Sequence, residues 1–335
     1  MIKKNSSLFN MFQIVMGILL VYGLVWIFNM ASSKVAEETL PVGWQIIRPP
    51  QEVSTLVLQG DTVWVGGRDG IHLLDRQTGK QQKVPPSLSK LRYVNEILVA
   101  KNGMIWIAHN GGLTRYWAET GEGITASPND GMLPGGIATV YQDRNQQIWV
   151  GNEEGLVRYD GEKWIRYTMK DGLGTPGVTV IYQDGKGLLW FGSSSHIHGG
   201  LSSYDGQMWH TYSIKDGLAH NAINTIVEDG KGLWVGTGFA NEGGASHLSN
   251  GQWKTITKKD GLAGEKVRSI LWDKEGWVLF GSEYDGLALY DGEKWLIYKK
   301  EQGLAGKEIK KMLQDQEGVY WLATENGVSR IEKIH

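Results

Sequence analysis

The sequence contains no cysteine, and that absence removes several kinds of chemistry at once. Without a thiol, the chain can form no disulfide, no thiolate metal site, no cysteine nucleophile and no lipid-modified lipoprotein cysteine. Proline is also scarce, at 8 of 335 residues, whereas glycine and tryptophan are abundant at 46 and 15. Many tight turns combined with many large flat side chains favour a turn-rich, all-β repeat protein.

An excess of charge of either sign is lacking as well. Lysine and arginine number 34 against 36 aspartates and glutamates, and no basic stripe is present that could neutralise a phosphate backbone. The phosphate-binding, zinc-protease and serine-hydrolase motifs that carry recognisable chemistry are also absent. We therefore expect no nucleic-acid partner, no cofactor, no catalytic residues and no enzyme activity.

The first 35 residues contain a long apolar run over residues 9–30. As a helix it would span roughly 33 Å, enough for a hydrocarbon core of about 30 Å. Lys3 and Lys4 precede the run, so the positive-inside rule places residues 1–8 in the cytoplasm. The sequence predicts a single-pass transmembrane anchor followed by an exported chain. The alternative is a cleaved signal peptide, which the length of the run and Asn29-Met30-Ala31 fit poorly.

The rest of the chain is dominated by one repeat, a large apolar residue two positions before glycine or alanine. Seven copies, spaced 41 to 45 residues apart, begin at Trp64, Trp106, Trp149, Trp190, Trp234, Leu279 and Trp321. This period is typical of a propeller blade with four strands. We predict a linker over residues 31–42 and a seven-bladed β-propeller over residues 43–335, in the periplasm or outside the cell.

The fifth repeat shows the expected strands most clearly, at residues 223–227, 233–237, 245–249 and 252–257, with a wide loop before residue 245. Asn-Gly and Asp-Gly pairs tolerate the positive φ angles of short hairpins and mark the turns.

The seventh repeat ends after its third strand, Gly327 to Ile331, while Gly43 to Ile47 resembles an outer strand. We expect the two segments to pair and to close the ring without an open edge. An eight-bladed ring would lack an eighth copy, and a solenoid has no reason to split a repeat between its ends.

The third repeat carries a family resemblance. It reads Tyr141-Gln142-Asp143, then Ile148 to Gly151, then Gly155 to Gly161, and closes with Asp171-Gly172-Leu173. These residues resemble the two-component regulator propeller repeat, found in extracytoplasmic sensor regions of bacterial signalling proteins. The resemblance covers nearly everything from Gly43 to Ile331. It implies a membrane-anchored sensor or binding module that presents an envelope ligand to a separate partner. No kinase or output module follows the propeller, so we expect no direct phosphorelay by this chain.

Two other functions stay open at this point. Streptogramin lyases are also seven-bladed propellers with a tryptophan-containing repeat, and that family uses His and Glu residues at a metal-dependent site on one face. This alternative rests on fold analogy alone. The chain could also be a scaffold for envelope proteins. The expected partner is accordingly a small molecule, a glycan or an envelope protein, besides the membrane.

The predicted ligand site lies on one face of the ring. In a four-stranded blade, the loop between the second and third strands shares a face with the connection to the next blade, and these loops vary between blades. Rigid scaffolds display binding residues on such loops, and those of the fourth and fifth blades look longest. We expect a concave polar site near the central channel, with contacts among His196, His198, Asn241, Glu242, Tyr284, Glu325, Arg68 and His109.

Metal binding is not expected. His196 and His198 point the same way on an extended segment but lack a third ligand, and a solvated, glycine-flanked loop tip is the commoner explanation for such a pair. Acidic turns such as Asp273-Lys274-Glu275-Gly276 lack the further oxygens of a calcium loop. The strand tryptophans are expected to pack between blades, since stacked blades bury both faces of each sheet.

Overall fold

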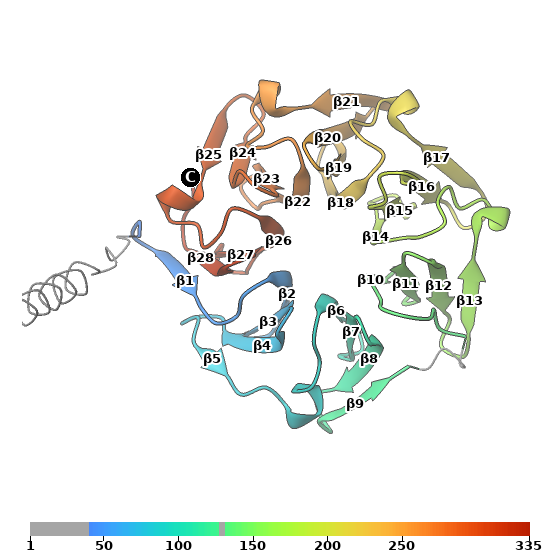
Figure 1. The fold of residues 1–335 in the computed structure, drawn as a ribbon, viewed down its shortest axis with the longest axis horizontal. Coiled ribbons are helices and arrows are strands. Elements are labelled where there is room, and N and C mark those ends of the chain that lie inside the picture. The colour runs from blue at the N-terminus through green and yellow to red at the C-terminus, as the bar shows by residue number, and fades with distance from the viewer. Residues whose placement is uncertain (1–39, 127–130) are drawn as a thin grey trace, which may run out of the picture. The chain divides into compact units, whose positions relative to one another are not determined.

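The computed structural model describes residues 40–126 and 131–335. Their strands form seven antiparallel sheets of four strands each, arranged around a central opening (Figure 1). The predicted seven-bladed propeller is thereby confirmed. The predicted anchor at residues 9–30 lies outside the described residues. Within the described ranges, no helix has the length and apolar character needed to span a bilayer.

The first four blades follow one another along the chain. Blade 1 comprises β2 (Val53–Gln59), β3 (Thr62–Gly67), β4 (Gly70–Asp75) and β5 (Gln81–Gln82). Blade 2 comprises β6 (Val94–Val99), β7 (Ile105–His109), β8 (Gly112–Trp117) and β9 (Glu122–Thr125). Blade 3 comprises β10 (Thr139–Gln142), β11 (Ile148–Asn152), β12 (Gly155–Tyr159) and β13 (Trp164–Tyr167). Blade 4 comprises β14 (Val180–Gln183), β15 (Leu189–Ser193), β16 (Gly200–Tyr204) and β17 (Trp209–Tyr212).

The last three blades complete the ring. Blade 5 comprises β18 (Ile223–Asp229), β19 (Gly232–Phe239), β20 (Glu242–Ser249) and β21 (Gln252–Ile256). Blade 6 comprises β22 (Val267–Trp272), β23 (Val278–Ser282), β24 (Leu287–Tyr290) and β25 (Trp295–Tyr298). Blade 7 comprises β26 (Ile309–Gln314), β27 (Tyr320–Thr324), β28 (Gly327–Ile331) and, from the other end of the propeller, β1 (Trp44–Ile47).

Blade 7 closes the ring as the sequence predicts. Strand β1 lies antiparallel to β28, with Trp44 opposite Ile331 and Ile47 opposite Val328. The first and last strands therefore lie side by side in Figure 1. The indole of Trp44 also donates to the carbonyl oxygen of Lys333 at 3.1 Å. Closure gives the third strand of blade 7 a partner along its outer edge, which would otherwise be open to pairing with another chain.

The repeated tryptophans pack as wedges between blades, as predicted. Trp149 is 1% exposed and packs with Ile181 and Phe191 of the next blade. Its indole N–H donates to the buried carboxylate of Asp143 at 2.8 Å, which satisfies the one polar group of the wedge. The same indole–carboxylate pair recurs as Trp190 with Asp184, Trp234 with Asp229, and Trp321 with Asp315.

The Asp-Gly-Leu connections have a shared structure that the sequence did not show. In the first of them, Met169–Asp171 forms a short 3-10 helix, and the Asp171 carboxylate accepts from the backbone N–H and the hydroxyl of Thr168. Gly172 follows with a φ of 107°, and a Cβ at this position would lie 2.9 Å from the Trp209 ring of the next blade. Only glycine fits there, so this residue sets the approach of one blade to the next.

The wide loop predicted in blade 5 is wrong. Strands β19 and β20 continue as a regular ladder to Phe239 opposite Glu242, and only Ala240 and Asn241 form the turn. Ala240 takes a positive φ of 50° there. Gly238, Gly243 and Gly244 lie within the extended ladder, and glycine-rich sequence had indicated a loop rather than a strand. The hairpin of blade 5 therefore projects as a rigid two-stranded extension.

Candidate ligand site at the channel mouth

The direction of the strands divides the propeller into two faces. The loop face carries the loops between second and third strands and the connections between blades. The turn face carries the other two hairpin turns of each blade. The innermost strands run from the loop face toward the turn face and enclose a cavity of about 650 Å³. Polar and charged side chains line this cavity, among them Asn95, Glu96, Asn224, Arg268, Lys310 and Lys311.

An ion pair joins two walls of the channel. The Lys311 ammonium on β26 lies 2.9 Å from the Glu96 carboxylate on β6, although blade 1 separates their blades around the ring. The second carboxylate oxygen of Glu96 accepts from the Thr139 hydroxyl at 2.9 Å. The negative charge of Glu96 raises the pKa of Lys311 above its ordinary value, so the ammonium remains charged. Glu96 is thus held between β10 and β26, with its carboxylate lining the channel.

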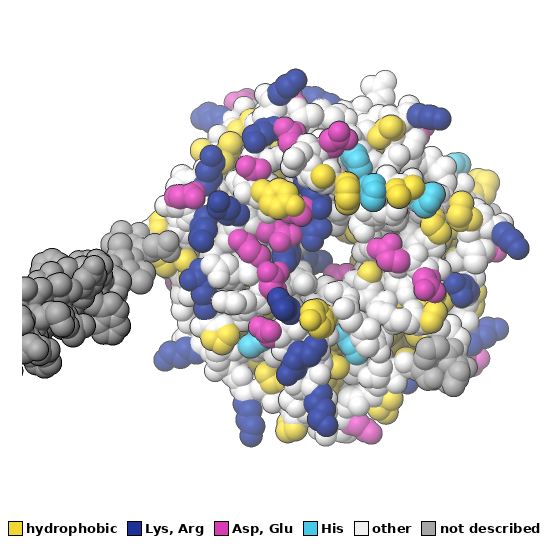
Figure 2. All heavy atoms as spheres, in the orientation of Figure 1, with side chains coloured by type: hydrophobic (Ala, Val, Ile, Leu, Met, Phe, Trp, Pro, Cys, Tyr) yellow, Lys and Arg dark blue, Asp and Glu magenta, His cyan; other side chains and the backbone are white. Residues whose placement is uncertain are grey.

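A second charged group lies at the rim of the channel. Lys310 contacts Glu52 at 2.8 Å and Glu308 at 3.3 Å, and Arg268 contacts Glu308 at 3.2 Å. Acidic and basic side chains accordingly gather beside the central opening over blades 6, 7 and 1 (Figure 2). These side chains alternate in sign and are half-buried, and their mutual ion pairs orient them at the rim.

Glu283, on the loop of blade 6, extends this charged rim. Its carboxylate pairs with Lys266 and accepts from the Tyr284 hydroxyl at 2.8 Å. Burial alone would raise the pKa of Glu283, but these hydrogen bonds and the neighbouring cations lower it below its ordinary value. Tyr284 is largely exposed and lies beside the ionised carboxylate. Tyr284 is thus a predicted contact that the structure brings to the charged rim.

The loop of blade 4 contacts the hairpin of blade 5 on the loop face. The imidazole of His196 stacks on Phe239 with ring centroids 3.9 Å apart, so the blade 5 extension reaches the loop of blade 4. Glu242 and His196 both act on the nearby His220. Burial lowers the pKa of His220 below its ordinary value, and the charge of Glu242 only partly offsets this effect. Figure 2 shows histidine and hydrophobic side chains in a row over these two blades. The row forms the less charged side of the channel mouth.

The other predicted contacts are placed differently. His198, Asn241 and Arg68 are exposed on loop tips. Glu325 accepts backbone hydrogen bonds from Lys307 and Glu308 with its two carboxylate oxygens, which binds it to the connection between blades 6 and 7.

His109 lies inside blade 2 rather than on an exposed loop. It is only 6% exposed, accepts from the N–H of Gly111 and contacts the Thr114 hydroxyl at 2.9 Å. Burial lowers the pKa of His109, so a neutral imidazole is favoured. The contacts give this side chain a structural role, and its expected exposure on a loop tip is not seen.

Sequence reasoning missed the residues of the channel wall. The prediction relied on variable loops, whereas the charged residues Glu96, Arg268, Lys310 and Lys311 lie on the innermost strands. A signal was available, because strands that line a channel are polar on one face only. Lys310-Lys311 and Asn95-Glu96 interrupt strands that are otherwise apolar, at the ends nearer the loop face.

A second cavity of about 710 Å³ lies between blades 5 and 6, away from the channel. Its walls include Trp234, Trp272 and Trp295 together with turn residues such as Asp291 and Gly292. Most of these belong to the repeated framework. We therefore place the candidate ligand site at the channel, where the lining residues differ from blade to blade.

The sequence profile of the two-component regulator propeller family matches residues 217–239, which run from the connection before blade 5 to the end of β19. The chain carries the two-component regulator propeller repeat. No curated protein sequence matches the chain significantly.

Several solved structures share the propeller fold of this chain. The extracellular domain of a protein described as a hybrid two-component system from B. thetaiotaomicron has a TM-score of 0.75 at 21% identity. The match covers 88% of this chain and 41% of that one. A second such domain from the same organism gives 0.70 at 19% identity, covering 86% and 39%. The chain thus spans about two fifths of the length of those domains.

A virginiamycin B lyase from Staphylococcus aureus, whose structure contains quinupristin, is also similar. Its TM-score is 0.66 at 15% identity, and the match covers 87% of this chain and 99% of the lyase. At such identities these likenesses establish the propeller fold that both groups share. A shared fold does not identify a function, which depends on the residues at the channel.

Proposed function

We propose that this chain is an extracytoplasmic sensor propeller that binds a small polar molecule or a glycan at the mouth of its channel and presents the bound state to a separate partner. The observation that carries the proposal is the charged channel wall, above all the Lys311–Glu96 pair. A ring held together by apolar wedges has no structural need for charged residues in its channel, where partial desolvation is costly. Their retention favours recognition of a polar ligand.

Two kinds of surface meet at this mouth. The rim formed by Glu52, Lys310, Glu308 and Arg268 offers charged donors and acceptors. The row formed by His196 and Phe239 offers flat, partly exposed rings. Flat rings beside hydrogen-bonding groups suit a molecule with one apolar and one hydroxyl-rich face, as many sugars have. This is why a glycan or a polar small molecule is preferred over a nucleic acid.

The membrane anchor is part of the proposal. It is supported by the apolar run over residues 9–30 after Lys3 and Lys4, and by the extracellular origin of the similar B. thetaiotaomicron domains. Protease added to spheroplasts should remove the propeller and leave a small membrane-bound fragment. Complete protection of the propeller would contradict export. Release of soluble propeller without protease would indicate cleavage of a signal peptide instead of anchoring.

The binding site is tested by thermal shift with a panel of glycans and polar metabolites. A ligand that stabilises the chain should lose at least about tenfold in affinity in Lys311→Gln, because each direct charged hydrogen bond contributes about 1.5–3 kcal/mol. A His198→Ala, Glu242→Ala double variant tests the loop residues separately. Lys254→Gln, on an outer strand, is the matched control and should bind normally. Equal affinity in all three variants would place the site elsewhere.

A lyase of the streptogramin type is the second candidate. The observation in its favour is the similarity along the whole lyase chain, and Glu242 and His196 both lie near enough to His220 on the loop face to influence its pKa. Incubation with quinupristin should then give a linear product that chromatography separates from the ring. Absence of turnover at any metal concentration would remove this candidate without affecting the sensor proposal.

A further inference from the structure

Blade 6 lacks the wedge tryptophan that every other blade has. Leu279 replaces the wedge tryptophan, yet Asp273 precedes it at the same distance at which Asp143 precedes Trp149. Because blade 6 has no indole at this position, Oδ2 of Asp273 lacks the N–H donor that the equivalent aspartates have in blades 3, 4, 5 and 7. Asp273 is nevertheless only 4% exposed, so its buried carboxylate needs other partners in the interior.

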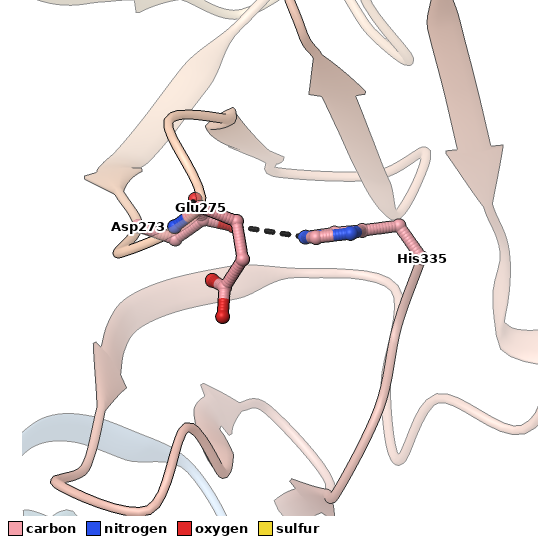
Figure 3. A group of neighbouring side chains, drawn as sticks. All are labelled: Asp273, Glu275 and His335. Atoms are coloured by element: carbon pink, nitrogen blue, oxygen red, sulfur yellow. Dashed lines mark hydrogen bonds and ion pairs between the residues drawn. The ribbon is translucent and has the colours of Figure 1, made fainter.

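The segment after β28 fills the space that the missing tryptophan leaves. Ile334 is buried in a cluster with Leu279 and Tyr320, and its carbonyl oxygen accepts from the Tyr298 hydroxyl at 2.6 Å. The next residue, His335, stacks on Trp277 with ring centroids 4.6 Å apart. These contacts fix the imidazole so that it faces blade 6 (Figure 3).

Four side-chain atoms converge as a result. Nε2 of His335 lies 3.1 Å from Oδ2 of Asp273 and 3.2 Å from the hydroxyl of Tyr320. That hydroxyl lies 2.8 Å from Oδ2 of Asp273 and 3.3 Å from Oε2 of Glu275. One donor atom each from Asp273, Glu275 and His335 lies within 4.8 Å of the other two. Among the described residues, this is the only group of three such side chains.

We propose that Asp273, Glu275 and His335 bind a divalent transition-metal ion, of which Zn²⁺ is the representative. Two ligand atoms at about 2.0–2.2 Å from a tetrahedral zinc ion lie roughly 3.3–3.6 Å apart. The 3.1 Å between Nε2 of His335 and Oδ2 of Asp273 is close to that separation, and the ligand atom of Glu275 lies within 4.8 Å of both. An imidazole with two carboxylates suits zinc better than calcium, which takes six to eight oxygens. A divalent cation would also compensate the negative charge that two neighbouring carboxylates bring together.

The surrounding residues hold the ligands in place. Oδ1 of Asp273 accepts from the backbone N–H groups of Glu275 and Trp277 at 3.0 and 2.8 Å. Oε2 of Glu275 accepts from the side chain of Gln314 at 3.0 Å. Such secondary hydrogen bonds orient metal ligands and contribute to affinity. The Tyr320 hydroxyl donates to Oδ2 of Asp273 at 2.8 Å and so also orients this carboxylate.

The site changes the interpretation of the acidic turn Asp273 to Gly276. By itself this turn has too few ligands for a cation, and the sequence therefore predicted no metal. The additional nitrogen comes from His335, which is 62 residues away from Asp273 in the chain. The metal would join the turn of blade 6 to the segment that follows the last strand of blade 7.

The test measures Zn²⁺ binding to the full chain prepared without a polyhistidine tag. We expect one zinc per chain by calorimetry and a rise in the thermal midpoint on adding zinc. His335→Ala and Glu275→Gln should each weaken zinc binding at least tenfold. Glu275 is exposed, so its variant keeps the fold, which circular dichroism verifies. Cobalt added in place of zinc should give the visible absorption of a tetrahedral site in the original chain but not in His335→Ala or Glu275→Gln.

Two histidine variants serve as controls. His210→Ala removes an exposed imidazole on β17, and His198→Ala removes one of the paired histidines on the loop face. Both should bind zinc as the original chain does. The proposal is overturned if the original chain binds no zinc, if His335→Ala and Glu275→Gln bind it with unchanged affinity, or if His198→Ala or His210→Ala abolishes binding instead.

Discussion

Blades 3 and 6 solve one packing problem in two ways. In blade 3, Trp149 fills the space between blades and satisfies Asp143 with its own indole. In blade 6, the smaller Leu279 leaves space that a distant segment fills, and Asp273 accepts from Tyr320 and His335. The comparison teaches that a framework carboxylate becomes available for other chemistry once its indole partner is lost.

The largest expected effect comes from making blade 3 resemble blade 6 without the compensating segment. Trp149→Leu removes contacts with Tyr167 and Phe191 and deprives Oδ2 of the buried Asp143 of its indole donor. We expect the free energy of unfolding to fall by about 3 kcal/mol or more. Urea denaturation measures the change. Trp272→Leu, at a tryptophan that is 44% exposed, is the matched control and should cost far less. Equal losses would mean that the wedge has no special role.

An intermediate effect is expected from the reverse substitution in blade 6. Leu279→Trp places an indole where it can donate to Asp273, in competition with Tyr320 and His335. Overpacking against Ile334 should cost about 1–3 kcal/mol. Zinc affinity should fall at least tenfold, because the indole occupies the carboxylate that the metal needs. Zinc binding at full affinity in this variant would show that the wedge position and the metal site are independent.

The smallest effect should be common to both blades. Asp160 and Asp291 occupy equivalent turns of blades 3 and 6, and the backbone N–H groups of Lys163 and Lys294, respectively, donate to them. These hydrogen bonds lower the pKa of both carboxyls below their ordinary value of 3.8. The resulting stability is present at neutral pH and is lost as the pH falls through the lowered pKa of the folded state.

Asp160→Asn and Asp291→Asn should therefore reduce the thermal midpoint slightly and equally at pH 7. Below about pH 3 the loss should disappear, because the original carboxyls are then protonated as well. Calorimetric scans at the two pH values make the measurement. A clear difference between the two variants at pH 7 would show that blades 3 and 6 differ beyond the wedge position.

Much of the framework could be predicted from the sequence because it repeats. The spacing of the tryptophans predicted seven blades, and the unpaired segment around Trp44 predicted the closure with β28. The Asp–Trp pairs of blades 3, 4, 5 and 7 also recur and could have been found from their spacing of five or six positions.

The site was less predictable, since its contacts join single residues of different blades. Nothing periodic relates Lys311 to Glu96 or His335 to Asp273, and each pair forms only when the ring brings distant segments together. The blade 5 hairpin was misinterpreted for a local reason. Its glycines are typical of loops, and the pairing of Phe239 with Glu242 decides the matter only in three dimensions.

The pairing of β1 with β28 also has a consequence for biosynthesis. At about 5–20 residues per second, a ribosome needs on the order of 15 to 55 seconds between completing β1 and reaching β28. During that interval Trp44 to Ile47 has no strand to pair with, and its apolar residues are available to the wrong partners. The nascent chain must therefore be kept from misassembly until its last blade emerges, so a chaperone that shields this segment would raise the yield of closed rings.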